Sequence, residues 1–245
     1  MRPEDIIRVE REIRDREAGE YDRINAGLWW QDGVFDAVAR ERLRFRPDHV
    51  VLDAGCGTGR NLPELARLSG ELFGADHSAE SLKVARRRLD STLPAHRSRA
   101  VRLLRTDLRD IPLASSCMDR IHCAGVLQML PDHRTRLETL REFLRLLKPG
   151  GSVLIFTYRW GRSIRRDKEG YFPNGGAYRF AFTGEEISSL FSEAGFRDVK
   201  LGGAVLFPRL GGRLGLDPER IARAAFTPLG LTLGHHWAVH ARRGL

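Results

Sequence analysis

The chain has 245 residues, which suits one large α/β domain and, less comfortably, two small ones. Hydrophobic residues make up 42% of it, enough for a core, and no run approaches the roughly 20 apolar residues that cross a bilayer. The Arg- and Glu-rich first twenty residues lack a signal-peptide core. Cys56, Cys117 and Cys123 have no metal-ligand spacing and suit a reducing compartment. Composition therefore argues against a membrane-spanning, exported or metal-binding protein and predicts a cytoplasmic one.

The net charge of +9 leaves an anionic partner open, either nucleic acid or a membrane surface. Basic residues are mostly interleaved with acids along the whole chain, which favours solvated charge on every face. The exception is residues 159–168, which hold five basic residues against one acid, Asp167.

In chain order, helical spacing of apolar residues predicts helices over residues 4–17 and around 34–43, which form an N-terminal cap. Strands are then predicted at 49–52, 71–75, 101–104, 118–124 and 152–157. Helices are predicted at 61–68, from Ser78, and up to the Lys-Pro-Gly-Gly breaker at 148–151. Thr183 and Glu186 predict a capping box for a helix ending at Gly195, followed by strands at 196–207 and 231–241.

This alternation predicts an α/β fold with a doubly wound, mainly parallel sheet covered on both faces. We expect a single domain over 1–245, with the cap at 1–45, a core at 46–200, and terminal strands at 201–245. The insertion at 208–230 has no readable pattern.

A glycine loop follows the first strand. Asp53-x-Gly55-x-Gly57-x-Gly59 lets the backbone approach a ligand closely, although a glycine-rich turn without a ligand is equally consistent with the loop alone. Arg60 at the sixth position breaks the dinucleotide fingerprint, and no phosphate-binding P-loop pattern is present.

Acidic residues end three successive predicted strands: Asp53, Asp76 and Asp107. Ligands of such sheets bind beyond the carboxyl ends of the strands. Asp76 is placed to accept both hydroxyls of a ribose, Asp107 to accept an exocyclic amine, and Leu108 to offer a backbone N–H to a ring nitrogen. Asp53 can organise the loop and face a cationic ligand. A surface carboxylate that caps the next helix is the alternative for Asp76 taken alone.

Five motifs in order resemble those of the class I S-adenosylmethionine-dependent methyltransferases, over roughly residues 45–200. The first is the glycine loop, Val50 to Leu62, and the second is Asp76, which is similar to the ribose-binding acid. The third is the adenine-contacting segment, Thr106-Asp107-Leu108 with Ile111-Pro112. The fourth is the fourth strand with its loop, Met118 to Ile121 and Val126 to Gln128, together with the turn before the fifth strand, Leu147 to Gly151, and the fifth is Phe182 to Ile187 with Glu193 to Phe196. The resemblance implies a seven-stranded sheet of order 3-2-1-4-5-7-6 with the last strand antiparallel. It implies S-adenosyl-L-methionine as cofactor and S-adenosyl-L-homocysteine as product, and no metal. The cofactor-binding residues that it implies are Tyr21, Asp53, Ala54, Gly55, Cys56, Gly57, Gly59, Asn61, Asp76, His77, Asp107, Leu108 and Ala124.

Two positions depart from the pattern. His77 stands where an aliphatic residue commonly packs on the adenine, and Gln128 stands where relatives often have a histidine. No obligatory catalytic residue follows from methyl transfer, which chiefly needs positioning and exclusion of water. Gln128, Tyr158 and His235 are weak catalytic candidates. His235 and His236 open the last strand and one of them could serve as a base, although ordinary strand positions are favoured for both. Tyr158 and Trp160 are candidates for shaping the acceptor pocket.

The sequence thus predicts methyl transfer to an O, N or C nucleophile of a small molecule, such as a specialised metabolite or a quinone or lipid precursor. One alternative is an RNA methyltransferase, motivated by the charge and residues 159–168, but no Asn-Pro-Pro-Tyr-like tetrapeptide follows the fourth strand. The other is a protein that keeps the cofactor without methylating, either a catalyst such as a cyclase or a binding protein. The oligomeric state is not predicted.

Overall fold

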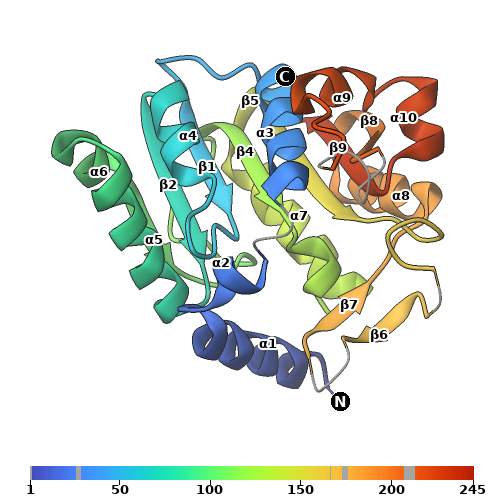
Figure 1. Ribbon diagram of the computed structural model, residues 1–245, viewed down its shortest axis with the longest axis horizontal. Helices are drawn as coiled ribbons and strands as arrows, with labels where there is room; N and C mark the ends of the chain where they lie inside the picture. Colours follow the sequence, from blue (N-terminus) through green and yellow to red (C-terminus); the bar gives the residue numbers. More distant parts are fainter. Residues whose placement is uncertain (1, 26–28, 166, 173–175, 207–212) are drawn as a thin grey trace.

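The computed structural model describes residues 2–25, 29–165, 167–172, 176–206 and 213–245. Three helices come first: α1 (Pro3–Glu17), α2 (Tyr21–Ile24) and α3 (Trp29–Leu43). α1 buries Ile6, Glu10 and Ile13 on one face, the spacing of an amphipathic helix. In Figure 1, α1 lies across the lower end of the molecule, at the carboxyl ends of the parallel strands.

A seven-stranded sheet forms the centre of the molecule, in the order β3-β2-β1-β4-β5-β9-β8. Its strands are β1 (Val50–Ala54), β2 (Glu71–Asp76), β3 (Arg102–Arg105), β4 (Met118–Ala124), β5 (Leu147–Tyr158), β8 (Arg197–Ala204) and β9 (His236–Arg242). β9 is antiparallel to both of its neighbours, β5 and β8, and the other pairs are parallel. Numbered within the sheet alone, this is the predicted order 3-2-1-4-5-7-6 with the last strand antiparallel, so the predicted fold is confirmed.

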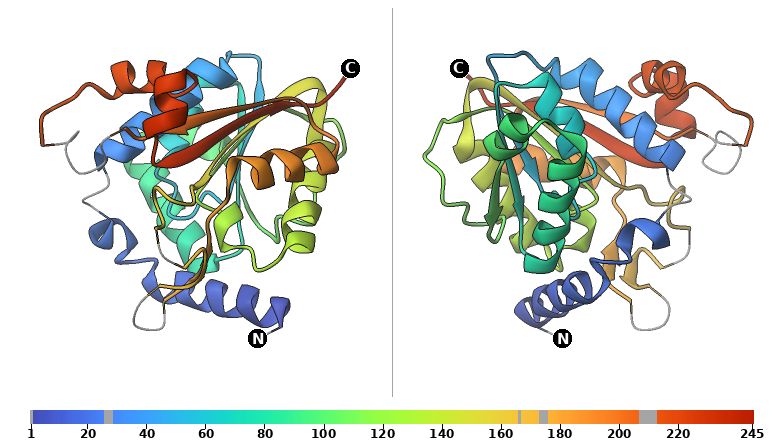
Figure 2. Two further views of the ribbon diagram at one scale, coloured as in Figure 1. Left: turned by 90° about the vertical axis from the view of Figure 1, so that its right-hand side faces the viewer. Right: turned by 60° about the vertical axis from the view of Figure 1, so that its left-hand side comes forward.

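Helices cover both faces of the sheet (Figure 2). Alternate residues of β1 separate the two sides, since Val51 packs with the cluster of α4 (Leu62–Leu68) and α5 (Ala79–Thr92), whereas Leu52 packs with that of α7 (His133–Leu146) and α8 (Gly184–Ala194). The register Val51↔Arg120, Leu52↔Ile121 carries this division into β4. α3 and α9 (Pro218–Ala224) pack around Leu154 and Phe156, which lie on the same side as Val51.

Polar caps set the beginnings of the main helices. The Ser78 hydroxyl accepts from the N–H of Ser81, and Asp132 accepts from that of Thr135. Thr183 and Glu186 form the predicted capping box at α8, and the helix ends at Gly195 with a left-handed φ of +100°. The remaining elements are α6 (Ala95–Ala100), the single turn η2 (Leu127–Met129), the hairpin β6 (Glu169–Tyr171) with β7 (Tyr178–Phe180), and α10 (Pro228–Leu233).

The structure corrects three predicted boundaries. The last strand begins at His236, not at residue 231, because Thr227 caps α10 and Pro228 occupies its first turn. Residues 148–151 end the helix as predicted but already belong to β5, which starts at Leu147. The strand predicted over 196–207 ends at Ala204, and residue 207 lies outside the described residues. The insertion that had no readable pattern contains α9 and the start of α10.

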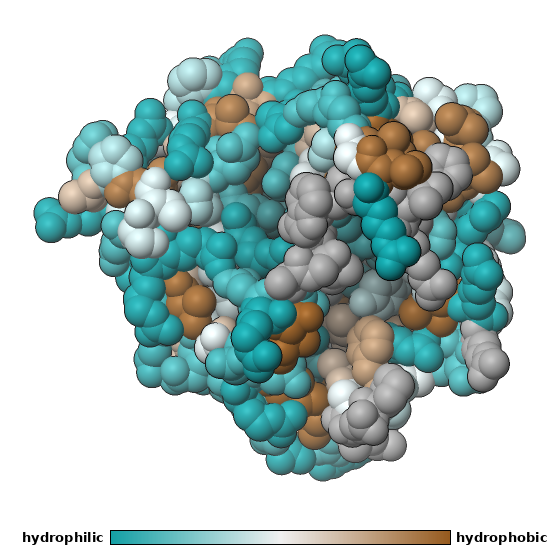
Figure 3. Space-filling model, in the orientation of Figure 1, coloured by the Kyte–Doolittle hydropathy of each residue, from teal (hydrophilic) through white to brown (hydrophobic). Residues whose placement is uncertain are grey.

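Hydrophilic side chains cover most of the face seen in Figure 3, and hydrophobic ones form small separate areas. Among the described residues, no helix is both long and apolar enough to cross a membrane, and no group of three potential metal ligands occurs.

Candidate functional site

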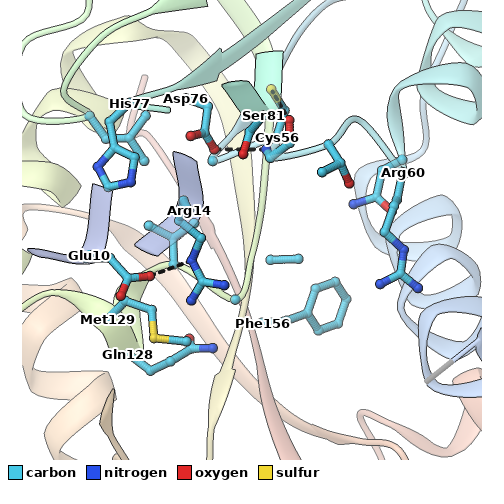
Figure 4. Close-up of a pocket in the computed structure, with 18 of the residues that line it drawn as sticks. Glu10, Arg14, Cys56, Arg60, Asp76, His77, Ser81, Gln128, Met129 and Phe156 are labelled. Atoms are coloured by element: carbon cyan, nitrogen blue, oxygen red, sulfur yellow. Dashed lines mark hydrogen bonds and ion pairs between the residues drawn. The ribbon is translucent and has the colours of Figure 1, made fainter. Parts of the chain in front are cut away.

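A pocket of about 290 Å³ lies where the carboxyl ends of β1, β2, β4 and β5 meet α1 and α2 (Figure 4). Of the residues predicted to bind a cofactor, the structure brings ten to its lining. They are Tyr21, Gly55, Cys56, Gly57, Asn61, Asp76, His77, Asp107, Leu108 and Ala124. Residues far apart in the sequence therefore converge as expected for a ligand site at the switch point of a doubly wound sheet.

The three glycines of the loop are required for different reasons. Gly55, Gly57 and Gly59 all have left-handed φ angles, of +75°, +50° and +77°. A Cβ on Gly55 would stand 2.1 Å from a methyl of Val126, and one on Gly59 would stand 2.8 Å from the Cβ of Ala85. A Cβ on Gly57 would meet no atom within 4 Å. Two of the glycines thus allow close packing, and Gly57 leaves open space beside the pocket for a ligand.

Asp76 ends β2 and connects the glycine loop with α5. One carboxylate oxygen accepts the N–H of Gly57 and the other accepts that of Ser78, both at 2.9 Å. The residue is only 9% exposed and lines the pocket. Its position is therefore fixed by backbone, with a negative charge presented to a ligand.

Asp107 holds a second carboxylate at the rim. Arg109 donates to it from Nη2 at 2.7 Å and from its own backbone N–H at 2.9 Å. Burial alone would raise the pKa of Asp107, but these hydrogen bonds and the Arg109 charge lower it below its usual range. Asp107 is consequently ionised at neutral pH.

Three predicted residues do not line the pocket: Asp53, Ala54 and Gly59. Asp53 is buried beneath the loop, and its Oδ1 lies 2.8 Å from Nδ1 of the equally buried His122 on β4. The expectation that Asp53 faces a cationic ligand is therefore not met by the geometry. Its carboxylate instead links β1 to β4 under the site.

The half of the pocket away from Asp76 contains a buried ion pair that the sequence did not reveal. Arg14 Nε donates to Glu10 Oε1 at 2.6 Å, and both side chains come from α1. Glu10 is 6% exposed, and its Oε2 has no hydrogen-bond partner among the described residues. Figure 4 shows the pair beside Gln128 and Met129. The available signal was that Glu10 stands on the apolar stripe between Ile6 and Ile13.

Two of the three weak catalytic candidates line this half. Gln128 is buried, with Oε1 accepting from the Thr157 hydroxyl at 3.0 Å. Burial raises the pKa of Tyr158, so its hydroxyl is protonated at neutral pH. The third candidate, His235, is not on the lining, whereas the next residue, His236, is. Trp160 is also absent from the lining.

His236 is buried, and burial, with a smaller effect of His235, lowers its pKa to about 3. It is therefore neutral at pH 7. Phe35 meets the imidazole edge-on at a ring separation of 5.5 Å. The sequence grouped His236 with His235 as a possible base, but strand alternation alone does not say which of the two reaches the cavity.

The cap is attached to the core by carboxylates that reach the loops around the pocket. Each of its three helices supplies at least one such contact. Glu4 pairs with Arg109 at 3.0 Å, Asp15 accepts from the Ser78 hydroxyl at 2.6 Å, Asp22 accepts from the Thr58 hydroxyl at 3.0 Å, and Asp32 pairs with Arg60. Thr58, Arg60 and Arg109 line the pocket, and Ser78 caps the helix that follows Asp76. The cap and the site are therefore one unit.

Comparison with known proteins agrees with this geometry. Residues 51–151 match the family described as "Methyltransferase domain". Methyltransferase GfsG of Streptomyces halstedii is 33% identical over 145 residues, which cover 55% of this chain and only half of that protein. The ubiquinone/menaquinone biosynthesis C-methyltransferase UbiE of Coxiella burnetii is 26% identical, over 74% of this chain and 80% of that one. The crystal structure of Burkholderia thailandensis 1,6-didemethyltoxoflavin-N1-methyltransferase, with bound 1,6-didemethyltoxoflavin and S-adenosylhomocysteine, superposes with a TM-score of 0.66 at 16% identity, covering 100% of this chain and 92% of that one.

The fold and the pocket define the class: a Rossmann-like, class I S-adenosylmethionine-dependent methyltransferase fold. The chain carries a methyltransferase domain at residues 51–151, and the resemblance to this class that the five motifs indicated is confirmed.

Proposed function

We propose that this protein transfers a methyl group from S-adenosylmethionine to a nucleophilic atom of a small molecule. The observation that carries the proposal is the convergence of Gly57, Asp76 and Asp107 on one pocket at the carboxyl ends of the strands. These residues fit the cofactor, because the open space beside Gly57 admits a ligand and the buried carboxylate of Asp76 lies next to it. The family match and the likeness to GfsG and UbiE support the same chemistry.

Each side of the pocket has a separate task in this proposal. Asp76 receives the ribose hydroxyls, and the Asp107–Leu108 segment receives the adenine, with His77 beside it. Tyr21 closes over the methionine end. The cofactor supplies an electrophilic methyl group on a positively charged sulfur, so the chain needs to position the acceptor and exclude water rather than to activate the methyl. α1 and α2 exclude water by covering the pocket.

The acceptor occupies the half bounded by Glu10, Arg14, Gln128 and Tyr158. The free Oε2 of Glu10 accepts a hydrogen bond from a hydroxyl or amine of the acceptor, because a buried carboxylate oxygen without a partner is unfavourable until a donor reaches it. Tyr158 and His236, both neutral at pH 7, supply hydrogen-bonding groups without adding charge. A small acceptor with at least one hydrogen-bond donor suits this surface.

The basic segment 159–168 gives little support to RNA as the acceptor. Arg159 stacks on Trp237 at 4.2 Å and donates to the Gly234 carbonyl, and Arg162 donates to that of Thr232. Lys168 pairs with Glu186. Lys168 is thus neutralised by a carboxylate, and Arg159 and Arg162 are held against the fold by an indole ring and backbone carbonyls, which orient their guanidinium groups without cancelling their charge.

Two measurements test the proposal. Calorimetry should detect binding of S-adenosylhomocysteine to the full chain in a one-to-one ratio. Incubation with S-adenosylmethionine labelled in its methyl group, and with a panel of hydroxylated and aminated small molecules including quinone precursors, should move the label to one acceptor class. Cofactor binding without any transfer across the panel would favour a non-methylating protein, and label in tRNA would favour the RNA alternative.

A further inference from the structure

A second pocket of about 270 Å³ lies at the other end of the sheet from the methyl-transfer site. Its lining combines the end of α3 with the starts of β4 and β5 and with parts of β8 and β9. The residues are Glu41, Arg42, Leu43, Arg44, Arg120, Gly150, Ser152, Lys200, His240 and Arg242. In Figure 1 this is the upper end of the sheet, near the carboxyl terminus, whereas α1 marks the lower end.

Strand register explains why these side chains meet. Ser152 on β5 is paired with Arg120 on β4 and with Arg242 on β9, so the three lie in one row across neighbouring strands. His240, two residues before Arg242, is paired with Lys200 on β8. Residues two apart on a strand share a face, and paired residues lie side by side on it. All five therefore project from one face of the sheet.

The charges of this pocket are almost entirely of one sign. Five cations line it against one carboxylate, Glu41, which lies 3.3 Å from Arg42. Within the described parts of the chain, no carboxylate lies within ion-pair distance of the other four cations. Arg120 donates to the backbone carbonyls of Leu43 and Asp119, which hold its guanidinium in place without neutralising it. Like charges gathered without partners repel one another, so they favour binding of an anion.

His240 provides an independent sign of an absent partner. It is 93% buried, as its relative exposure is 7%, and its Nε2 has no hydrogen-bond partner among the described residues. Burial, and then the neighbouring Arg242, Arg42, Lys200 and Arg120, lower its pKa to about 4. The Nε of Arg42 is likewise buried and unpartnered. Buried polar atoms of folded proteins are normally satisfied, so these two are best explained as donors for a ligand.

We propose that this pocket is a second ligand site, which takes the phosphate group of a small phosphorylated molecule. Lys200 and Arg242 supply the charge at its mouth, and Ser152, His240 and Arg42 supply donors deeper in. Phosphate is the matching anion because it accepts several charge-assisted hydrogen bonds at once. A recess with a buried floor suits one compact group better than a nucleic-acid backbone, which needs cations spread along a groove. The site is separate from the methyl-transfer pocket and does not depend on that activity.

The test measures binding of inorganic phosphate and of glycerol 3-phosphate to the full chain by calorimetry, with chloride keeping the ionic strength constant. Both Lys200 and Arg242 are exposed and have no ion-pair partner in the described structure, so Lys200→Gln/Arg242→Gln should fold normally. The loss of two charged donors should weaken binding by at least about tenfold. The single variant Lys200→Gln leaves the sequence of β9 unchanged, and its affinity for phosphate should lie between those of the double variant and wild type.

The matched control is Arg87→Gln/Arg99→Gln, which removes the same charge from exposed positions on α5 and α6. It should bind phosphate as wild type does, and melting temperatures without phosphate should show that all variants fold. Tighter binding of glycerol 3-phosphate would identify an ester as the ligand, and tighter binding of phosphate would identify the free ion. The proposal is overturned if wild type binds neither, if the control loses as much affinity as the pocket variant, or if tRNA binds through Lys200 and Arg242 while phosphate does not.

Discussion

The two cavities of this protein differ in whether their lining arginines have carboxylate partners. Around the pocket at the carboxyl ends of the parallel strands, each described lining arginine has a carboxylate partner: Arg14 with Glu10, Arg60 with Asp32, and Arg109 with Asp107. Around the basic pocket, within the described structure, only Arg42 has one. The net charge of +9 therefore does not indicate where an anion binds. The ion pairs do, because only a cation without a carboxylate partner offers its full charge to a ligand.

The largest expected effect concerns the first pocket. Asp76→Ala should weaken binding of S-adenosylhomocysteine by at least about tenfold, since a charge-assisted pair of hydrogen bonds is worth about 1.5–3 kcal/mol or more. The substitution also frees the N–H of Gly57, so part of the loss comes from a looser loop. Calorimetry at one temperature measures it.

The control is Glu71→Gln, which removes a carboxylate from the exposed far end of the same strand. It should bind the product as wild type does. Equal affinity of Asp76→Ala and wild type would contradict the ribose assignment. Phosphate binding at the basic pocket should be the same in all three proteins.

The next effect is a pH dependence of stability that arises from two histidines on β9, one in each cavity. The pKa of His236 is lowered to about 3 and that of His240 to about 4. An imidazole in the unfolded chain titrates near 6.5, so below that pH the unfolded state binds more protons and stability is lost as the pH falls toward these values. The loss should be on the order of 2 kcal/mol for each imidazole between pH 7 and pH 5.

Urea unfolding of His236→Gln and His240→Gln at both pH values tests this, and each variant should lose about half of the effect. Added salt distinguishes the contributions of the two histidines. Added salt should reduce the share of His240 more than that of His236, because four neighbouring cations add to the effect of burial on the pKa of His240, whereas only His235 adds to it at His236. An unchanged pH dependence in either variant would show that its histidine is not the group responsible.

A smaller effect is expected from Glu10→Gln, which leaves Arg14 without its carboxylate. If Glu10 receives a donor of the acceptor, kcat/KM for the acceptor should fall by about tenfold, the value of one charge-assisted hydrogen bond. The affinity for S-adenosylhomocysteine should change little. Glu12→Gln is the control, because Glu12 also faces an arginine one turn away, Arg8, but on the exposed side of α1. A loss of cofactor affinity equal to the loss of kcat/KM would instead assign Glu10 to the cofactor half.

The same contrast shows how far the sequence could be interpreted. The sheet order and the glycine loop were predictable because short apolar runs and the spacing of Gly55, Gly57 and Gly59 are local features. Asp76 and Asp107 were also identifiable, since each lies within three residues of the end of a predicted strand. The inward position of Glu10 depends on how α1 packs, and charge alone favours placing it in solvent.

The basic pocket was not predictable for a related reason. Its residues come from five separate segments, and only the register of β4, β5, β9 and β8 brings Arg120, Ser152, Arg242, His240 and Lys200 together. A shift of one residue in any strand would turn that strand's contribution to the opposite face. The last three residues of α10, Leu231-Thr232-Leu233, were also predicted as part of the last strand, because they alternate like one. Register and packing are properties of the whole fold and leave no local pattern.

The smallest expected effect comes from a substitution that gives the cations of the basic pocket a carboxylate partner. Lys200→Glu places a carboxylate beside His240 and near Arg242, so unfavourable repulsion becomes attraction. Exposed pairs contribute about 0.2–1 kcal/mol, so the free energy of unfolding in urea at low ionic strength should rise by about that amount. The gain should shrink at high salt, and phosphate should no longer bind. Lys83→Glu, which replaces a cation paired with Glu80 on exposed α5, should instead destabilise slightly. If Lys200→Glu behaved like Lys83→Glu, the cations of the basic pocket would not repel one another, and the contrast between the two cavities would fail.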